Sequence, residues 1–150
     1  LTGGRVKKIK PYVEGENFML TYGDGVSNVD INALIKFHES HGKICTLTAV
    51  RPESRFGYID FDGNKVLSFR EKSHMDVGYI NGGYMVMRPE VFDYIEGDYS
   101  LEQEPMTKLV NAGEIMAYKH EGFWQCMDTL RDKKKLEALW EENNAPWKMW

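Results

Sequence analysis

The clearest structural signal in the sequence is the stretch NFMLTYGDG, residues 17–25. Its apolar and aromatic half is typical of a buried strand, and the Gly-Asp-Gly end predicts a tight turn. A helix is predicted next, capped by Asp30 and stopped by Gly42, with apolar residues recurring every three or four positions. Residues 44–50 are rich in β-branched side chains and predict a second strand. The order strand, helix, strand indicates a βαβ unit.

The middle of the chain has a different pattern. Residues 58–61 and 66–69 lie on either side of an Asp-Gly-Asn turn and predict a β-hairpin. Residues 79–87 predict a further strand that contains two adjacent glycines. Glycines inside a strand indicate that another group approaches the backbone closely.

The last third of the chain predicts a helix, a strand and a final helix. Ser100 and Gln103 match a capping box for a helix that ends near Gly113. Residues 115–118 predict a strand, and 130–143 an amphipathic helix. The side chains expected to face inward on the two helices are Met106, Leu109, Val110, Leu136, Leu139 and Trp140. Together these elements predict an α/β fold with a mixed sheet.

Composition limits the classes of function. Residues 1–150 are enough for a single unit with a buried core, and 42% of them are hydrophobic. With 19 basic and 23 acidic residues the net charge is −4, which argues against a nucleic-acid partner. No signal-peptide pattern and no run of about 18 apolar residues is present, so no membrane contact is expected. Cys45 and Cys126 lie far apart, which favours a reducing, cytoplasmic compartment.

Two acidic residues are candidate metal ligands. Asp24 follows a predicted buried strand, at the place where α/β proteins bind ligands, and Asp128 precedes the last predicted helix. Mg²⁺ is usually held by one or two carboxylates together with substrate phosphates, so two converging acids would suit it. Each residue also fits a simpler role, Asp24 as a turn residue and Asp128 as a helix N-cap. Spacing alone favours the simpler roles.

Several charged residues are candidates for binding phosphates or sugars. Lys72 can meet a phosphate while Glu71 accepts sugar hydroxyls, although a surface ion pair is the commoner arrangement. Arg5 follows a predicted Gly-Gly turn and can meet phosphates beside backbone amides. His38 and His41 share a helix face but have no third ligand nearby, so they are predicted to be helix-surface histidines.

Seven motifs, in order along the chain, resemble those of the glucose-1-phosphate cytidylyltransferases, a branch of the sugar-phosphate nucleotidylyltransferase family. The motifs are TGGR (2–5), FMLTYGDGV (18–26), RFG (55–57), FREK (69–72), INGGY (80–84), EQEP (102–105) and FWQCMDTLRD (123–132). Each motif alone is weak, but seven in sequence are strong. The Gln-Glu-Pro and Trp-Gln-x-Met-Asp-Thr segments favour the cytidylyl branch over its relatives.

The resemblance implies a Rossmann-like nucleotidylyltransferase fold and the conversion of CTP and glucose 1-phosphate into CDP-glucose and pyrophosphate. By similarity, Asp24 and Asp128 would hold Mg²⁺ and act in catalysis together with Lys72, which would meet the sugar phosphate. Arg5 would meet the nucleotide triphosphate. The residues expected to line the sugar pocket are Gly57, Glu71, Asn81 and Gly82.

The chain departs from the family pattern in two ways. Ser73 and Cys126 stand where the family has proline, and both are local changes in turns. The larger difference is that the family's Gly-Gly-x-Gly-Thr-Arg-Leu loop and its Pro-Lys-Pro segment occur nowhere in these residues. We therefore expect a C-terminal portion that lacks the N-terminal nucleotide-loop units and is inactive alone.

Such a portion would leave part of its sheet uncovered, so self-association is expected and a homo-oligomer is predicted. Two alternatives remain open at this point. One is a nucleotidylyltransferase with another base or sugar specificity. The other is a non-catalytic domain that binds sugar phosphates or forms oligomers.

Overall fold

The computed structural model describes residues 1–13, 15–53, 57–71 and 78–150. Within these ranges no helix has the length and apolar character needed to cross a membrane. The elements, in chain order, are α1 (Thr2–Lys8), η1 (Lys10–Tyr12), β1 (Phe18–Thr21), β2 (Gly25–Ser27), α2 (Ile31–His41), β3 (Cys45–Val50), β4 (Gly57–Asp62), β5 (Lys65–Glu71), β6 (Ile80–Met87), η3 (Pro89–Tyr94), α3 (Glu104–Asn111), β7 (Ile115–His120), β8 (Trp124–Cys126) and α4 (Leu130–Glu141).

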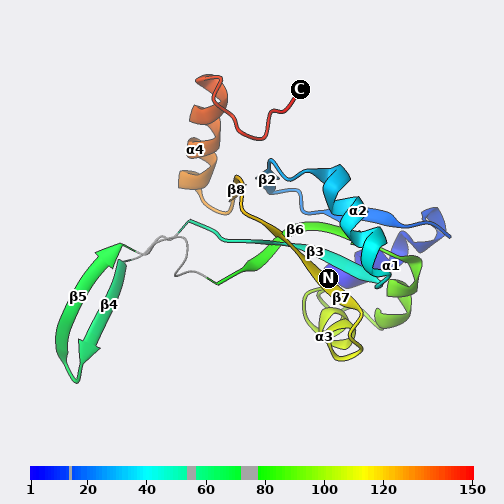
Figure 1. Cartoon of the computed structure of the whole chain (residues 1–150). Helices are drawn as coiled ribbons and strands as arrows, with labels where there is room; N and C mark the ends of the chain where they lie inside the picture. The colour runs from blue at the N-terminus through cyan, green and yellow to red at the C-terminus, as the bar shows by residue number, and fades with distance from the viewer. Residues whose placement is uncertain (14, 54–56, 72–77) are drawn as a thin grey trace.

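A four-stranded mixed sheet forms the body of the molecule (Figure 1). The strand order is β1-β6-β3-β7, in which β6 is antiparallel to both β1 and β3, while β3 and β7 are parallel. β1, β3 and β7 therefore run in the same direction, and their carboxyl ends lie at one edge of the sheet. The predicted βαβ unit is present, with β6 inserted between its two strands. The prediction of an α/β fold with a mixed sheet is confirmed.

Both faces of the sheet are covered. On one face α1, η3 and α3 pack against the strands, and the buried core there comprises Val6, Phe18, Cys45, Met85, Met87, Val91, Phe92, Ile95, Leu101, Met106 and Leu109. Side chains alternate along β3, so Thr46 points to the opposite face from Cys45. There the Thr46 hydroxyl contacts His38 of α2. Helix α2 thus covers the second face.

Local sequence signals placed two elements correctly. Helix α2 begins where the Asp30 carboxylate accepts the Ala33 backbone N–H at 2.9 Å, and it ends at Gly42, whose φ of 68° is left-handed. The β4–β5 hairpin turns at Gly63, with a φ of 56°. In Figure 1 the hairpin stands apart from the four-stranded sheet. Its exposed apolar side chains are Ile59, Phe61, Val66 and Leu67.

The prediction of a Gly-Gly turn near the N-terminus is wrong, because residues 2–8 form helix α1. Two glycines lower helix propensity, which is why the sequence favoured a turn. Packing overrides that preference. The Gly3 backbone N–H donates to the Tyr99 carbonyl at 2.9 Å, and a Cβ on Gly3 would lie only 2.6 Å from the same oxygen.

The predicted capping box of α3 is also wrong. Gln103 is the N-cap and makes no side-chain capping bond, so the helix starts later than Ser100, and Pro105 lies in its first turn, where proline is tolerated. Two residues expected to face inward are exposed, Val110 by 60% and Trp140 by 49%. A helix as short as α3 buries a narrow face, which here consists of Pro105, Met106 and Leu109.

Candidate active site

Asp24 and Asp128 lie next to each other at the end of the two-stranded β2–β8 sheet. Gly25 pairs with Cys126 in the antiparallel register, and the Met127 backbone N–H donates to the Asp24 carbonyl at 2.7 Å. The two acids therefore stand one position apart across the strand pair, although they are far apart in the sequence. Both residues are exposed. The backbone of both acids therefore lies near the carboxyl end of β1.

Asp128 is not the N-cap of α4, so the simpler role predicted for it is wrong. The N-cap of α4 is Thr129, whose hydroxyl accepts the Asp132 backbone N–H, while the Asp132 carboxylate accepts the Thr129 N–H in return. This reciprocal capping box leaves Asp128 outside the helix terminus. The Asp128 carboxylate accepts a contact from the Cys126 thiol, with Sγ 3.4 Å from Oδ2.

The donor set at this place suits a hard divalent cation that is shared with phosphates. Mg²⁺ prefers oxygen ligands and commonly takes only one or two carboxylates from the protein, with water and substrate phosphates completing its octahedron. Asp24 and Asp128 supply two carboxylates. Across the described part of the chain, no three or more His, Cys, Asp and Glu side chains gather into a full metal site. The arrangement therefore fits a cation bound together with substrate rather than a structural metal.

Asn81 is tied into a hydrogen-bond network at the same edge of the sheet. Its side-chain Oδ1 accepts the Gly83 backbone N–H at 3.0 Å, and its Nδ2 donates to the Tyr22 hydroxyl at 3.1 Å. The Tyr22 hydroxyl in turn donates to the Glu102 carboxylate. Burial, followed by the neighbouring Glu102 carboxylate, raises the pKa of Tyr22 well above its usual range. Tyr22 thus stays a neutral donor.

Gly82 is closely surrounded by protein atoms, both at its carbonyl and at its Cα. Its carbonyl accepts the Trp124 indole N–H at 2.8 Å, and a Cβ would lie 2.8 Å from Val50 Cγ1. The adjacent Gly83 has a φ of 79°, and a Cβ there would lie 2.6 Å from the Tyr22 ring. The close approach predicted for these glycines therefore comes from the protein's own side chains. Whether they also contact a sugar stays a prediction.

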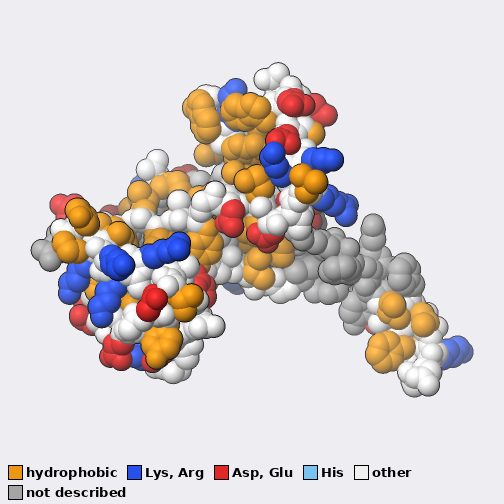
Figure 2. All heavy atoms as spheres, turned by 180° about the vertical axis from the view of Figure 1, so that it is seen from behind, with side chains coloured by type: hydrophobic (Ala, Val, Ile, Leu, Met, Phe, Trp, Pro, Cys, Tyr) orange, Lys and Arg blue, Asp and Glu red, His pale blue; other side chains and the backbone are white. Residues whose placement is uncertain are grey.

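Arg5 lies on α1 and is exposed, beside an open hollow of about 490 Å³ that Lys7, Lys8 and Asp98 also line. Figure 2 shows basic side chains gathered over this part of the body. The backbone amides predicted to assist Arg5 are already bonded, Gly3 N–H to the Tyr99 carbonyl and Arg5 N–H to the Leu1 carbonyl. A phosphate at this hollow would meet side chains rather than a cradle of free amides.

Gly57 and Glu71 are brought together by the hairpin. They are the first and last residues of β4 and β5, and they pair directly in the antiparallel register. Glu71 belongs to the hairpin strand, but its side chain lies outside the described part of the structure, and Lys72 lies outside the described residues. The sugar-phosphate role predicted for the Glu71-Lys72 pair stays a prediction.

His38 lies on α2 and is fully buried against β3, so the prediction of a surface histidine is wrong for it. His38 Nδ1 and His41 Nε2 both contact the Thr46 hydroxyl, at 2.8 Å and 2.7 Å. Burial lowers the pKa of both histidines, and nearby positive charges lower it further. This cluster holds a helix on the sheet and lies apart from the two acids.

A second recess lies beside Asp24, between β2 and α4. It has a volume of about 300 Å³, and its other lining residues include the apolar side chains Val26, Met127, Leu136 and Trp140. Its size is at the lower end of small-ligand sites. The recess would let an apolar or planar group lie next to the Asp24 carboxylate.

Several residues that hold this edge together have no role predicted from the sequence. Tyr22, Glu102, Gln125 and Asp132 are all hydrogen-bonded partners of the predicted site residues or of their turns. All four lie inside the motifs FMLTYGDGV, EQEP and FWQCMDTLRD. Their position within these motifs was the available signal. The partners of Tyr22 and Glu102 lie far away in the sequence, whereas Gln125 and Asp132 bond each other seven positions apart.

The class of protein follows from the sequence and the fold. Residues 4–146 match the nucleotidyl transferase family, and the chain belongs to that family. Its fold is similar to that of a putative glucose-1-phosphate thymidylyltransferase from Bacillus anthracis, with a TM-score of 0.68 and 16% identity, over 93% of this chain and 60% of that one. The Rossmann-like nucleotidylyltransferase fold expected from the sequence is confirmed.

Within the family, the chain is similar over all of its length to cytidylyltransferases. It is 53% identical over 152 residues to glucose-1-phosphate cytidylyltransferase of Salmonella typhi, and 38% identical over 152 residues to a probable glucose-1-phosphate cytidylyltransferase of Bacillus subtilis. In both comparisons all of this chain is covered, and it spans 59% of the relative's length.

Proposed function

We propose that the protein containing this chain transfers a cytidylyl group from CTP to glucose 1-phosphate, giving CDP-glucose and pyrophosphate. The 53% identity to a relative named for that reaction supports the choice of substrates. The structural observation that supports the proposal is the bond from Met127 N–H to the Asp24 carbonyl, since it brings together the backbone segments that carry Asp24 and Asp128. They lie where α/β sheets bind ligands.

The chemistry is a single displacement at phosphorus. A phosphate oxygen of glucose 1-phosphate attacks the α-phosphorus of CTP, a new P–O bond forms, and the bond to the β-phosphate oxygen breaks. The bonding electrons leave with pyrophosphate. Catalysis of such a step consists of positioning the reactants and stabilising charge. Mg²⁺, when bound, would neutralise the phosphate charge.

Four residues are assigned to the phosphates. Asp24 and Asp128 would hold Mg²⁺, and their exposure and adjacency support this role. Arg5 would attract the triphosphate as a cation on the surface of α1, with Lys7 and Lys8 adding charge. Lys72 would meet the sugar phosphate as a point charge at the end of the hairpin strand.

The sugar would be held between the hairpin and β6. Glu71 would accept hydroxyl groups, and Gly57, its partner across the hairpin, would let the sugar lie close to the backbone. Asn81 would offer the amide N–H that does not bond Tyr22, while Gly82 would contribute backbone. The network through Tyr22 and Glu102 fixes the orientation of the Asn81 amide, which supports a binding role.

The 150 residues are proposed to be inactive by themselves, because the family's glycine-rich loop is absent from them. We also propose a homo-oligomer. β1 is an edge strand of the described sheet, its Met19 side chain is 58% exposed, and the hairpin exposes apolar side chains. A cytoplasmic location is proposed from the two cysteines, which form no disulfide with each other.

The substrates are tested with a panel of nucleotides. The protein containing this chain is incubated with Mg²⁺, glucose 1-phosphate and CTP, UTP, dTTP or GTP, and pyrophosphate release is followed. We expect the highest kcat/KM with CTP. A higher kcat/KM with another nucleotide would contradict the proposed specificity for CTP. Binding of glucose 1-phosphate without any turnover would favour the non-catalytic alternative.

A further inference from the structure

The turn that carries Asp128 is held from its carboxyl side by a buried carboxylate of α4, that of Asp132. Asp132 is only 6% exposed to solvent. Its Oδ2 accepts the Thr129 backbone N–H at 3.0 Å and the Thr129 hydroxyl at 2.7 Å. Thr129 directly follows Asp128, so these bonds fix the backbone on one side of the candidate metal ligand.

The other side of the turn is held by Gln125, which is 8% exposed. The Gln125 Nε2 donates to the Cys126 carbonyl at 2.9 Å and to Asp132 Oδ1 at 3.2 Å. The turn from residue 126 to residue 129 therefore lies between two buried side chains that bond each other. Three of the bonds converge on one carboxylate, whose acceptor atoms are thus all engaged.

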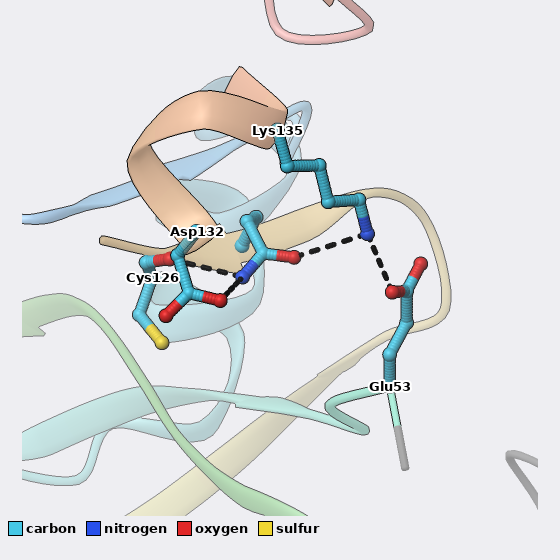
Figure 3. Close-up of polar contacts among 5 residues, drawn as sticks. Glu53, Cys126, Asp132 and Lys135 are labelled. Carbon is cyan, nitrogen blue, oxygen red and sulfur yellow. Dashed lines mark hydrogen bonds and ion pairs between the residues drawn. The ribbon is translucent and has the colours of Figure 1, made fainter. Parts of the chain in front are cut away.

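The orientation of the Gln125 amide is set by a third residue. Lys135 Nζ lies 3.3 Å from Gln125 Oε1 and also bonds the Glu53 carboxylate, as Figure 3 shows. An ammonium group can only donate, so the Gln125 oxygen faces Lys135 and its NH₂ group faces Asp132. Since Lys135 and Glu53 are partly exposed, their ion pair adds little free energy. Its effect is to orient the amide.

We propose that Gln125 and Asp132 are positioning residues that fix the Asp128 carboxylate for binding a divalent cation. This inference rests on the cation-binding role proposed above for Asp128. Substituting a group that orients a metal ligand commonly weakens metal binding. The ligand must then become ordered when the metal binds. Gln125 and Asp132 order the turn before a cation binds, because they hold it from both of its ends.

Two single substitutions and their combination test the pair. Gln125→Glu sets a second carboxylate against Asp132, and Asp132→Asn sets two amide groups against each other. In the double variant the polarity of the bond is reversed, since the new amide at 132 can donate to the new carboxylate at 125. That carboxylate can still accept from Lys135 but cannot donate to the Cys126 carbonyl, so the double variant should recover only part of what each single variant loses. Lys134→Gln, at an exposed position of the same helix, is the control.

The first readout is hydrogen exchange, measured by mass spectrometry on the protein containing this chain. We expect each single variant to raise exchange in residues 126–130 by about tenfold or more, because a buried partner is lost. Exchange in the double variant should lie between that of the single variants and that of the unsubstituted protein, because the bond to the Cys126 carbonyl is not restored. Exchange in α3 should stay constant. Unchanged exchange at 126–130 in the single variants would overturn the inference.

The second readout is the affinity for Mn²⁺, titrated with CDP-glucose present and followed by electron paramagnetic resonance. Each single variant should weaken Mn²⁺ binding by about 10- to 100-fold, and the double variant should restore it in part. Normal Mn²⁺ affinity in both single variants would overturn the positioning role alone. Absence of Mn²⁺ binding by the unsubstituted protein would overturn the cation-binding role of Asp128, and this inference with it.

Discussion

Gly82 lies in β6 where there is no space for a side chain. A Cβ at this position would come within 2.8 Å of Val50 Cγ1 and 3.1 Å of the Thr48 carbonyl oxygen. Both neighbours belong to β3, the strand that pairs with β6. The Thr48 oxygen is a backbone atom, so it moves only if the two strands separate.

Gly82→Ala should therefore lower the free energy of unfolding by about 1–3 kcal/mol, the usual cost of overpacking. Urea unfolding measures the change. Gly23→Ala is the matched control, because nothing lies within 4 Å of a Cβ built on Gly23. Equal stability of the two variants would contradict the steric role of Gly82.

The His38 cluster fits neutral imidazole rings. The Lys43 backbone N–H donates to His41 Nδ1 at 2.9 Å, so the proton of a neutral His41 is on Nε2, which then donates to Thr46 Oγ1. The Thr46 hydroxyl is left to donate to His38 Nδ1. Arg88 and Lys43 add positive charge near the rings. Protonation of either ring is therefore unfavourable in the folded protein.

This cluster predicts a loss of stability in mild acid. A pKa held below its ordinary value means that the unfolded chain binds more protons below about pH 6.5. The stabilisation is therefore complete above that pH and falls as the pH drops toward the folded-state pKa of His38. We expect the urea midpoint to be lower at pH 5.5 than at pH 7.5, and His38→Gln to show a smaller difference. His120→Gln, on β7, should keep the full difference.

Residues whose partners are close in sequence were predictable. Asp30 and Gly42 cap α2 through bonds and backbone angles within the same helix. The burial of His38 was not predictable, because it depends on Thr46 in the next strand. Asn81 was named through a resemblance, but its bond to Tyr22 joins residues 59 positions apart.

Helices α3 and α4 differ in how they begin. Thr129 and Asp132 form a complete capping box at the start of α4. At α3 the matching sequence pattern, Ser100 and Gln103, makes no such box, and the helix starts at Glu104. The proline in the first turn of α3 needs no backbone donor, so this terminus requires fewer capping bonds.

The two helix starts should respond differently to substitution. Thr129→Ala removes a bond to the Asp132 backbone N–H and should lower the free energy of unfolding by about 1 kcal/mol. Ser100→Ala should stay within about 0.5 kcal/mol of the unsubstituted chain. Chemical unfolding of both variants measures this, and a larger loss at Ser100 than at Thr129 would contradict the assigned helix starts.

The β4–β5 hairpin and helix α2 were predicted from local patterns, whereas the short strands β2 and β8 were not. The alternation on either side of a Gly-containing turn was enough for β4 and β5. Helix α1 was missed because its two glycines disfavour a helix locally, while the contact of Gly3 with Tyr99 is not visible in the sequence. Tertiary contacts decide such cases.

At the scale of the whole molecule, the pairing of β2 with β8 creates the candidate site. It joins the turn after β1 to the segment before α4, about 100 residues later in the chain. No periodicity in the sequence specifies that register, so Asp24 and Asp128 could be linked only through the family resemblance. The structure adds that the two acids lie at neighbouring positions.

The exposed apolar side chains predict association of the 150-residue chain. Phe61 and Val66 on the hairpin are 69% and 58% exposed, and β1 offers an unpaired edge in the described sheet. Burial of such surface is favourable in proportion to its area. Sedimentation velocity at increasing protein concentration should show a rising mean mass. A constant monomer mass up to high concentration would contradict this expectation.

The most direct test of the proposed function is the rate of CDP-glucose formation from CTP, glucose 1-phosphate and Mg²⁺ by the protein containing this chain. Asp24→Asn and Asp128→Asn should each lower kcat/KM by about 100-fold or more, because charge stabilisation at the phosphates is lost. Asp62→Asn, an exposed carboxylate at the hairpin tip, should leave the rate unchanged. Full activity in either of the first two variants would contradict the assignment of the paired acids.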